Sequence, residues 1–141
     1  MVFIVGPTYT VLVHAVNSQG VWGSGIAKKF KELYPHSFQE YNAVCTLRQN
    51  HNFYETAKEN SRKVGCLFTS KNYGNLKDSK DVILYNTVLA LEELGSLDNG
   101  GHYYSNKFNS GLFGVPWEET EKILAVAVQK FNLDWTVCEY E

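Results

Sequence analysis

The stretch VHAVNSQGVWGSGIAKKF, Val13 to Phe30, decides the fold that we expect for this chain. It begins as an apolar strand, passes through Gly20, Gly23 and Gly25, and then takes on helical spacing. Glycine costs conformational entropy, so such a cluster indicates a sharp bend or a close approach of the backbone to another group. A strand that leads through a bend into a helix is typical of α/β proteins, whose ligands bind where strands end.

Strands and helices alternate outward from this junction. Short apolar or β-branched runs predict strands at 2–5, 11–15, 53–56, 63–70, 102–106 and 134–139. Helical spacing of apolar residues predicts helices at 26–34, 37–45, 79–94 and 116–131, with Gly95 as a stop signal and Pro116 as a start. We therefore expect one α/β domain over residues 1–141, with a mixed, largely parallel sheet.

Composition excludes several classes of protein. Of the 141 residues, 44% are hydrophobic and 20% charged, and the net charge of −2 gives no general attraction to nucleic acids or anionic membranes. No apolar run has transmembrane length, and the N-terminus lacks the pattern of a signal peptide. Three scattered cysteines, Cys45, Cys66 and Cys138, suit a reducing compartment, and we expect Cys66 and Cys138 to be buried thiols. These features predict a soluble, cytoplasmic protein.

A second glycine-bearing junction, FNSGLFGVPWEETEKIL, runs from Phe108 to Leu124. The N–H groups of Gly23, Ser24 and Gly25 at the first junction would bind an anion, and residues 110–114 form a similar bend. Two facing loops of this kind suit a diphosphate or a phosphorylated sugar. The spacing matches neither a dinucleotide fingerprint nor a P-loop, and tight turns without a ligand remain the alternative.

His14 is the best candidate for acid–base or nucleophilic chemistry, because its pKa is ordinarily near neutrality and it lies close to the first loop. A hydrogen-bonded core histidine is the structural alternative. Trp22 and Phe113 lie within glycine loops, where an aromatic ring would cover a ribose or a base, or would simply pack over its loop. The remaining histidines have no spacing that forms a metal set, so we expect no metal.

These two loops resemble the pair of ligand loops of macro domains, and more narrowly the small branch that acts as ADP-ribose 1″-phosphate phosphatases. The segments LFTSKNYG and ILYNTVLALEEL also look like that branch, so the resemblance runs from about Val11 to Leu124. It implies a three-layer α/β/α sandwich. It also implies cleavage of ADP-ribose 1″-phosphate, a by-product of tRNA splicing or repair, to ADP-ribose and inorganic phosphate.

The resemblance assigns roles to individual positions. His14 stands where the phosphatase branch has its proposed catalytic residue, and Asn17 matches the asparagine that contacts the distal ribose. Phe113 takes the aromatic position over the distal ribose. The ligand-binding residues expected from the two loops are Asn17, Gly20, Trp22, Gly23, Ser24, Gly25, Ile26, Ser110, Gly111, Leu112, Phe113 and Gly114.

The sequence also departs from the family. Gly6-Pro7-Thr8 occupies the region where macro domains commonly carry an acidic residue that reads adenine. A related branch of ADP-ribosyl-ester hydrolases needs an aspartate where this chain has Phe113, although Lys31 lies near the lysine of that branch.

Three functions remain open on these grounds: the phosphatase, a non-catalytic module that binds ADP-ribose, and a hydrolase that removes ADP-ribose from protein or nucleic acid. For the phosphatase, His14 would activate water or form a phosphohistidine. We expect a monomer whose partner is ADP-ribose or ADP-ribose 1″-phosphate, with no cofactor, no membrane contact and no direct binding to nucleic acid.

Overall fold

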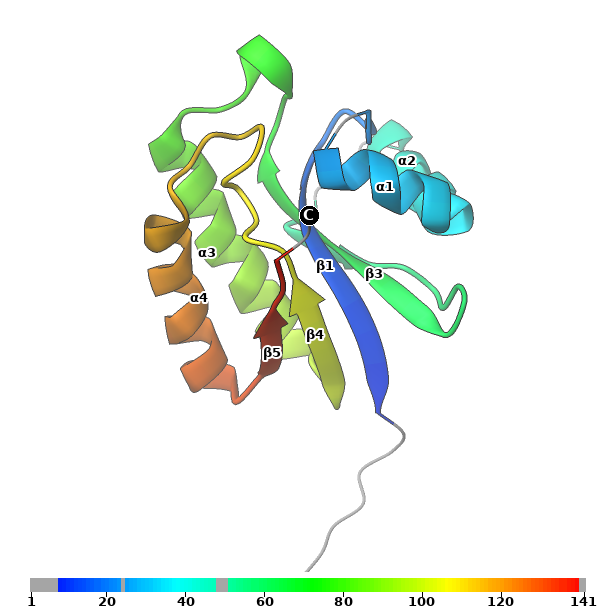
Figure 1. Cartoon of the computed structure of the whole chain (residues 1–141), viewed down its shortest axis with the longest axis vertical. Coiled ribbons are helices and arrows are strands. Elements are labelled where there is room, and N and C mark those ends of the chain that lie inside the picture. The colour runs from blue at the N-terminus through cyan, green and yellow to red at the C-terminus, as the bar shows by residue number, and fades with distance from the viewer. Residues whose placement is uncertain (1–7, 24, 48–50, 140–141) are drawn as a thin grey trace, which may run out of the picture.

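The computed structural model describes residues 8–23, 25–47 and 51–139, and they form a five-stranded sheet with helices on both faces (Figure 1). The strand order is β2-β3-β1-β4-β5, with β2 antiparallel to β3 and all other neighbours parallel. The strands are β1 (Tyr9–Asn17), β2 (Phe53–Glu55), β3 (Arg62–Ser70), β4 (Gly101–Ser105) and β5 (Asp134–Val137). The expected mixed, largely parallel sheet is confirmed.

The helices form a layer on each face of the sheet. One face carries α1 (Gly25–Leu33) and α2 (Pro35–Thr46), and the other carries α3 (Lys80–Leu97) and α4 (Trp117–Phe131) (Figure 1). A short 3-10 turn, η1 (Gly74–Leu76), interrupts the connection from β3 to α3. This arrangement is the three-layer α/β/α sandwich that the resemblance implies.

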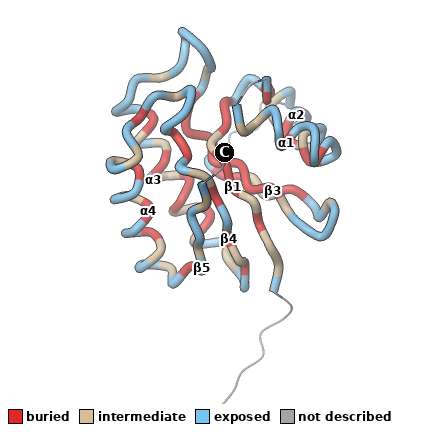
Figure 2. Tube along the Cα trace, viewed as in Figure 1, coloured by how far each residue is buried: buried red, intermediate tan, exposed pale blue. Residues whose placement is uncertain are grey.

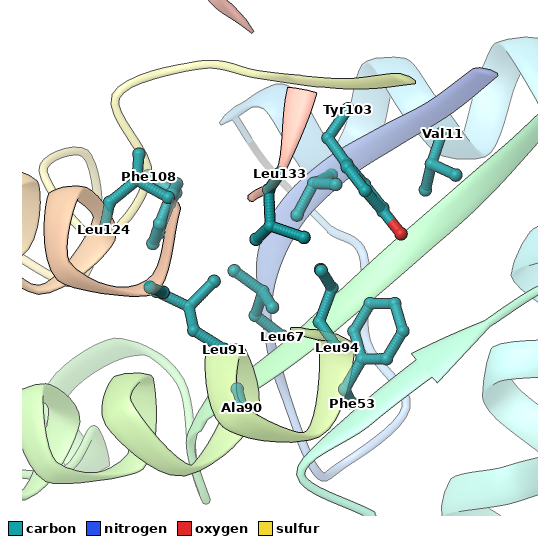
Figure 3. Packing of buried hydrophobic residues seen from close by; sticks show 12 residues of the cluster. Val11, Phe53, Leu67, Ala90, Leu91, Leu94, Tyr103, Phe108, Leu124 and Leu133 are labelled. Carbon is teal, nitrogen blue, oxygen red and sulfur yellow. The ribbon is translucent and has the colours of Figure 1, made fainter. Parts of the chain in front are cut away.

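Buried residues concentrate along β1 and β3 in the middle of the sheet (Figure 2). β1 alternates its side chains between two apolar clusters. Val11 and Val13 join the cluster under α3 and α4, and Val16 joins the one under α1 and α2. Leu91 and Leu94 of α3 point toward the sheet in the first cluster (Figure 3). A central strand buried on both faces explains its almost continuous apolar sequence.

Gly95 does not end its helix, which corrects one expectation. α3 continues through it to Leu97. A methyl group on Gly95 would collide with the ring of Phe131 on α4. The glycine is therefore explained by the close approach of two helices and not by a change of backbone direction.

Other boundaries differ by a few residues at most. α4 begins at Trp117 with Pro116 at its N-cap, close to the expected start. Cys66 is fully buried as expected, but Cys138 follows the end of β5 and is half-buried. The strand expected at 2–5 lies outside the described residues. Within the described ranges, no helix is both long and apolar enough to cross a membrane.

Candidate functional site

His14 lies at the C-terminal half of β1 and is completely buried. The centroid of its ring lies 4.7 Å from the ring centroid of Trp22 and 4.5 Å from that of Phe30, and both pairs have edge-on geometry. Neither ring nitrogen has a hydrogen-bond partner among the described residues. This burial lowers the pKa of His14 from 6.5 to about 3, because the imidazolium ion would lose its hydration. His14 is therefore neutral at physiological pH and retains an unprotonated nitrogen.

Asn17 ends β1 and fixes the shape of the first loop. Its side-chain Nδ2 donates to the carbonyl of Val21 at 2.8 Å, and its Oδ1 accepts from the N–H of Gln19 at 3.0 Å. The Tyr41 hydroxyl of α2 donates to the Asn17 carbonyl at 2.6 Å. In this state Asn17 bonds its own loop, so its expected contact with a ribose stays a prediction.

Gly20 and Trp22 face inward from the same loop. Gly20 has a φ of +82°, and a Cβ there would lie 2.8 Å from Nδ2 of Asn42 on α2. Trp22 is 1% exposed, and its ring stacks on that of Tyr41 at 4.8 Å. Of the two interpretations of Trp22, packing over the loop describes this position. A ligand contact by Trp22 stays a prediction.

The two glycine loops meet over the C-terminal edge of the sheet. Gly25 begins α1 with a φ of +62°, and a Cβ there would lie 3.8 Å from Cδ1 of Leu112 in the second loop. Gly23 and Gly25 are exposed, Ile26 is half-buried, and Ser24 lies outside the described residues. The expected juxtaposition of the two loops is thus present in the structure.

The second loop is a pair of tight turns with unpaired donors. The N–H of Gly114 donates to the carbonyl of Gly111 at 3.0 Å, and the hydroxyl of Ser110 donates to the carbonyl of Lys107. Within the described part of the chain, the N–H groups of Gly111, Leu112 and Phe113 donate to no protein acceptor. Exposed N–H groups in such a bend, opposite the N-terminus of α1, would bind an anion.

Asn109 anchors this loop, and the sequence analysis did not select it. It is 4% exposed with a φ of +68°. Its Oδ1 accepts from Thr69 of β3 at 2.8 Å, and its Nδ2 donates to Thr87 of α3 at 2.9 Å and to Thr120 of α4 at 3.4 Å. The sequence does carry one signal for this role. Asn109 directly precedes Ser-Gly, and asparagine is one of the residues that tolerate left-handed backbone in turns.

A third segment, residues 71–78, joins the site. Its first half lies within LFTSKNYG, one of the stretches that carry the resemblance, but none of its residues was expected in the site. It rises above the sheet between β3 and α3 (green in Figure 1). The carbonyl of Lys71 accepts from the N–H of Ser18 at 3.3 Å and from Nε2 of Gln19 at 3.1 Å. At its far end, the Cε of Lys77 lies 4.0 Å from where a Cβ of Gly114 would be. The segment is therefore bonded to the first glycine loop and lies beside the second.

Within the described ranges, no group of three or more His, Cys, Asp or Glu side chains is arranged to hold a metal ion. A cavity of about 390 Å³ lies beside Trp22 and Gly23, on the side of α1 that carries Lys28, Lys31 and Glu32. The ammonium of Lys31 lies 4.5 Å over the ring of Phe38 on α2. Lys31 is thus held toward the second helix in this state.

Comparison with known proteins agrees with this architecture. A model of the Macro domain family matches residues 13–124. An ADP-ribose 1″-phosphate phosphatase of Chaetomium globosum is 34% identical and covers 84% of this chain and 76% of its own. One from Aspergillus fumigatus is 31% identical and covers 84% and 82%. The macrodomain of Mycobacterium tuberculosis DarG shares the fold, with a TM-score of 0.72, 24% identity and coverage of 93% and 89%. The chain therefore belongs to the Macro domain family.

Proposed function

We propose that this protein is a phosphatase that hydrolyses ADP-ribose 1″-phosphate to ADP-ribose and inorganic phosphate. The observation that carries the proposal is the meeting of Gly25 and Leu112 over the end of β1, the strand that holds His14. The fungal relatives, which bear the name of this activity, support it over most of the chain. The unpaired N–H groups of the second loop, together with the N-terminus of α1, would stabilise the charge of the transferring phosphoryl group.

The neutral imidazole of His14 is in the protonation state that this chemistry requires. As a base it would take a proton from water, whose oxygen attacks phosphorus while the bond from phosphorus to the C1″ oxygen breaks. As a nucleophile it would form an N–P bond while the bond from phosphorus to the C1″ oxygen breaks, and water would then cleave the N–P bond to release phosphate. In both routes the departing C1″ oxygen takes up a proton, from the imidazolium ion or from solvent. In the base route, the charge of the phosphate would stabilise the imidazolium ion that forms as His14 takes the proton.

The burial of His14 sets a condition on this mechanism. A ring that is 0% exposed reaches a phosphate only if its contact with Trp22 or Phe30 opens. The same burial favours the second candidate, a module that binds ADP-ribose without turnover, in which His14 is only a core residue.

The cytoplasmic location and the monomeric state expected from the sequence remain proposals alongside the proposed activity.

The test is release of phosphate from ADP-ribose 1″-phosphate in the presence of EDTA. We expect release by the wild type and loss of about 100-fold or more in His14→Ala and His14→Asn, since positioned acid–base groups contribute on that scale. His36→Ala, at an exposed position of α2, is the matched control and should keep full activity.

The outcomes separate the two candidates. Calorimetric binding of ADP-ribose to each variant checks that the loops remain intact. Binding of ADP-ribose by the wild type without phosphate release would support the binding module. Release that survives both substitutions at His14 would leave the phosphatase but remove the histidine from its mechanism.

A further inference from the structure

The structure assigns to Lys77 the binding of the terminal phosphate of the substrate, an inference that rests on the proposed function. Lys77 stands at the C-terminal end of η1, in the segment 71–78 that forms a third wall beside the two glycine loops. It would make the protein prefer ADP-ribose 1″-phosphate over ADP-ribose, because only the first ligand carries the additional charge.

The segment that carries Lys77 is held at both ends. These ends are bonded to each other: the N–H of Lys71 donates to Oδ2 of Asp78 at 2.9 Å, and the N–H of Asp78 donates to Oγ of Ser70 at 3.0 Å. The Lys71 carbonyl is bonded to the first glycine loop, as described above. At the turn itself, the N–H of Lys77 donates to the carbonyl of Gly74 at 3.2 Å. The backbone of Lys77 is thus positioned before any ligand binds.

The side chain of Lys77 reaches the correct part of the second loop. Its Cε is placed beside Gly114, which follows Phe113, the residue expected over the distal ribose. The 1″-phosphate is attached to that ribose. A Cβ at Gly114 would lie 4.0 Å from the Cε of Lys77, an ordinary van der Waals distance, so the end of the lysine stem lies alongside this loop. An ammonium group at the end of this stem would therefore lie near the ribose end of the ligand.

Among the described residues, the ammonium group of Lys77 forms no ion pair, whereas two nearby lysines do. Lys107, just before the second loop, pairs with Glu139 at 3.0 Å, and Lys80 pairs with Glu119 at 3.2 Å. For Lys77 no carboxylate partner occurs among the residues that the structure describes. The chain as a whole has a net charge of −2, so an anionic substrate needs a local cation of this kind.

The experiment compares two ligands across charge variants of the lysine. For Lys77→Met we expect kcat/KM for ADP-ribose 1″-phosphate to fall about tenfold or more, as for other hydrogen bonds to charged groups. The dissociation constant for ADP-ribose should change by less than about threefold. Lys77→Arg should restore most of the activity, and the defect of Lys77→Met should shrink as salt is raised, because screening weakens the lost attraction. Lys58→Met, an exposed lysine between β2 and β3, is the control for a change in net charge alone.

Each outcome decides the assignment. An equal loss for both ligands would place Lys77 on the diphosphate and overturn the assignment. A loss that is independent of salt and not restored by arginine would make Lys77 structural, which also overturns it. If the wild type binds both ligands without turnover, the proposed phosphatase fails, but the ratio of the two dissociation constants, measured directly, still tests Lys77. If the wild type binds neither ligand, both proposals are overturned.

Discussion

Lowering the pH from about 7.5 to about 4.5 should cost the folded protein stability at His14, and the size of that cost follows from its burial. In the unfolded chain the pKa of His14 is 6.5, and in the folded chain it is about 3. Above 6.5 the ring is neutral in both states and contributes nothing. Between 6.5 and 3 only the unfolded state binds the proton, so stability falls as the pH falls through this window.

The magnitude can be worked out for one condition. At about pH 4.5, the unfolded state is two units below its pKa while the folded state is still neutral. At about 1.4 kcal/mol for each unit, the free energy of unfolding falls by about 2.7 kcal/mol on account of this single ring. Such a loss is a large part of the stability of an ordinary domain.

Urea unfolding of the wild type and of His14→Leu at the two pH values measures this quantity. Titration of the carboxyl groups is common to both proteins and cancels in the difference. We expect the wild type to lose about 2.7 kcal/mol more than the variant. His14→Asn provides a second comparison if leucine does not fold. Equal losses in wild type and variants, within about 0.5 kcal/mol, would mean that the buried ring finds a hydrogen-bond partner in solution and would refute the reasoning.

Three further substitutions test other contacts, each by urea unfolding. Gly95→Ala should destabilise the protein by about 1–3 kcal/mol, since its methyl group meets the ring of Phe131, although alanine alone would favour the helix; a gain in stability would contradict the close packing. Asn109→Ala should lower the free energy of unfolding by about 2–4 kcal/mol, because a buried hydrogen-bond network and a left-handed backbone position both depend on Asn109. The substitution should also weaken the binding of ADP-ribose. Unchanged binding would show that the second loop does not need this anchor. Tyr41→Phe should cost about 1–2 kcal/mol by leaving the Asn17 carbonyl without its donor, and an unchanged midpoint would mean that water replaces the hydroxyl.

The main elements of the fold could be predicted because their sequences carry strong local signals. Apart from His14, Val11 to Ala15 is apolar on both faces, as a central parallel strand requires, and Pro116 marks the start of a helix. Gly95 could not be interpreted in the same way. A glycine that ends a helix and one that admits a neighbouring helix look the same in sequence, and only the position of Phe131 distinguishes them.

The candidate site was predictable only in part, for a related reason. The glycine loops are visible as motifs, but the burial of Trp22 depends on Tyr41 of α2, the second helix after the loop. The role of Asn109 depends on three threonines from three separate elements. The segment 71–78 has no motif of its own that points to the other loops. Contacts between distant parts of the chain decide these features, and local patterns do not record them.

The position of β1 in the sheet has a consequence for how the protein is made. β1 lies between β3 and β4, so both strands that bond to it come later in the chain, the second from residues 101–105. During synthesis its apolar residues emerge from the ribosome long before either partner exists. Because pairing of this kind spans a large sequence separation, the sheet should assemble slowly and late. The nascent chain would thus present an unpaired apolar strand for most of its translation, a state that favours aggregation and the binding of chaperones.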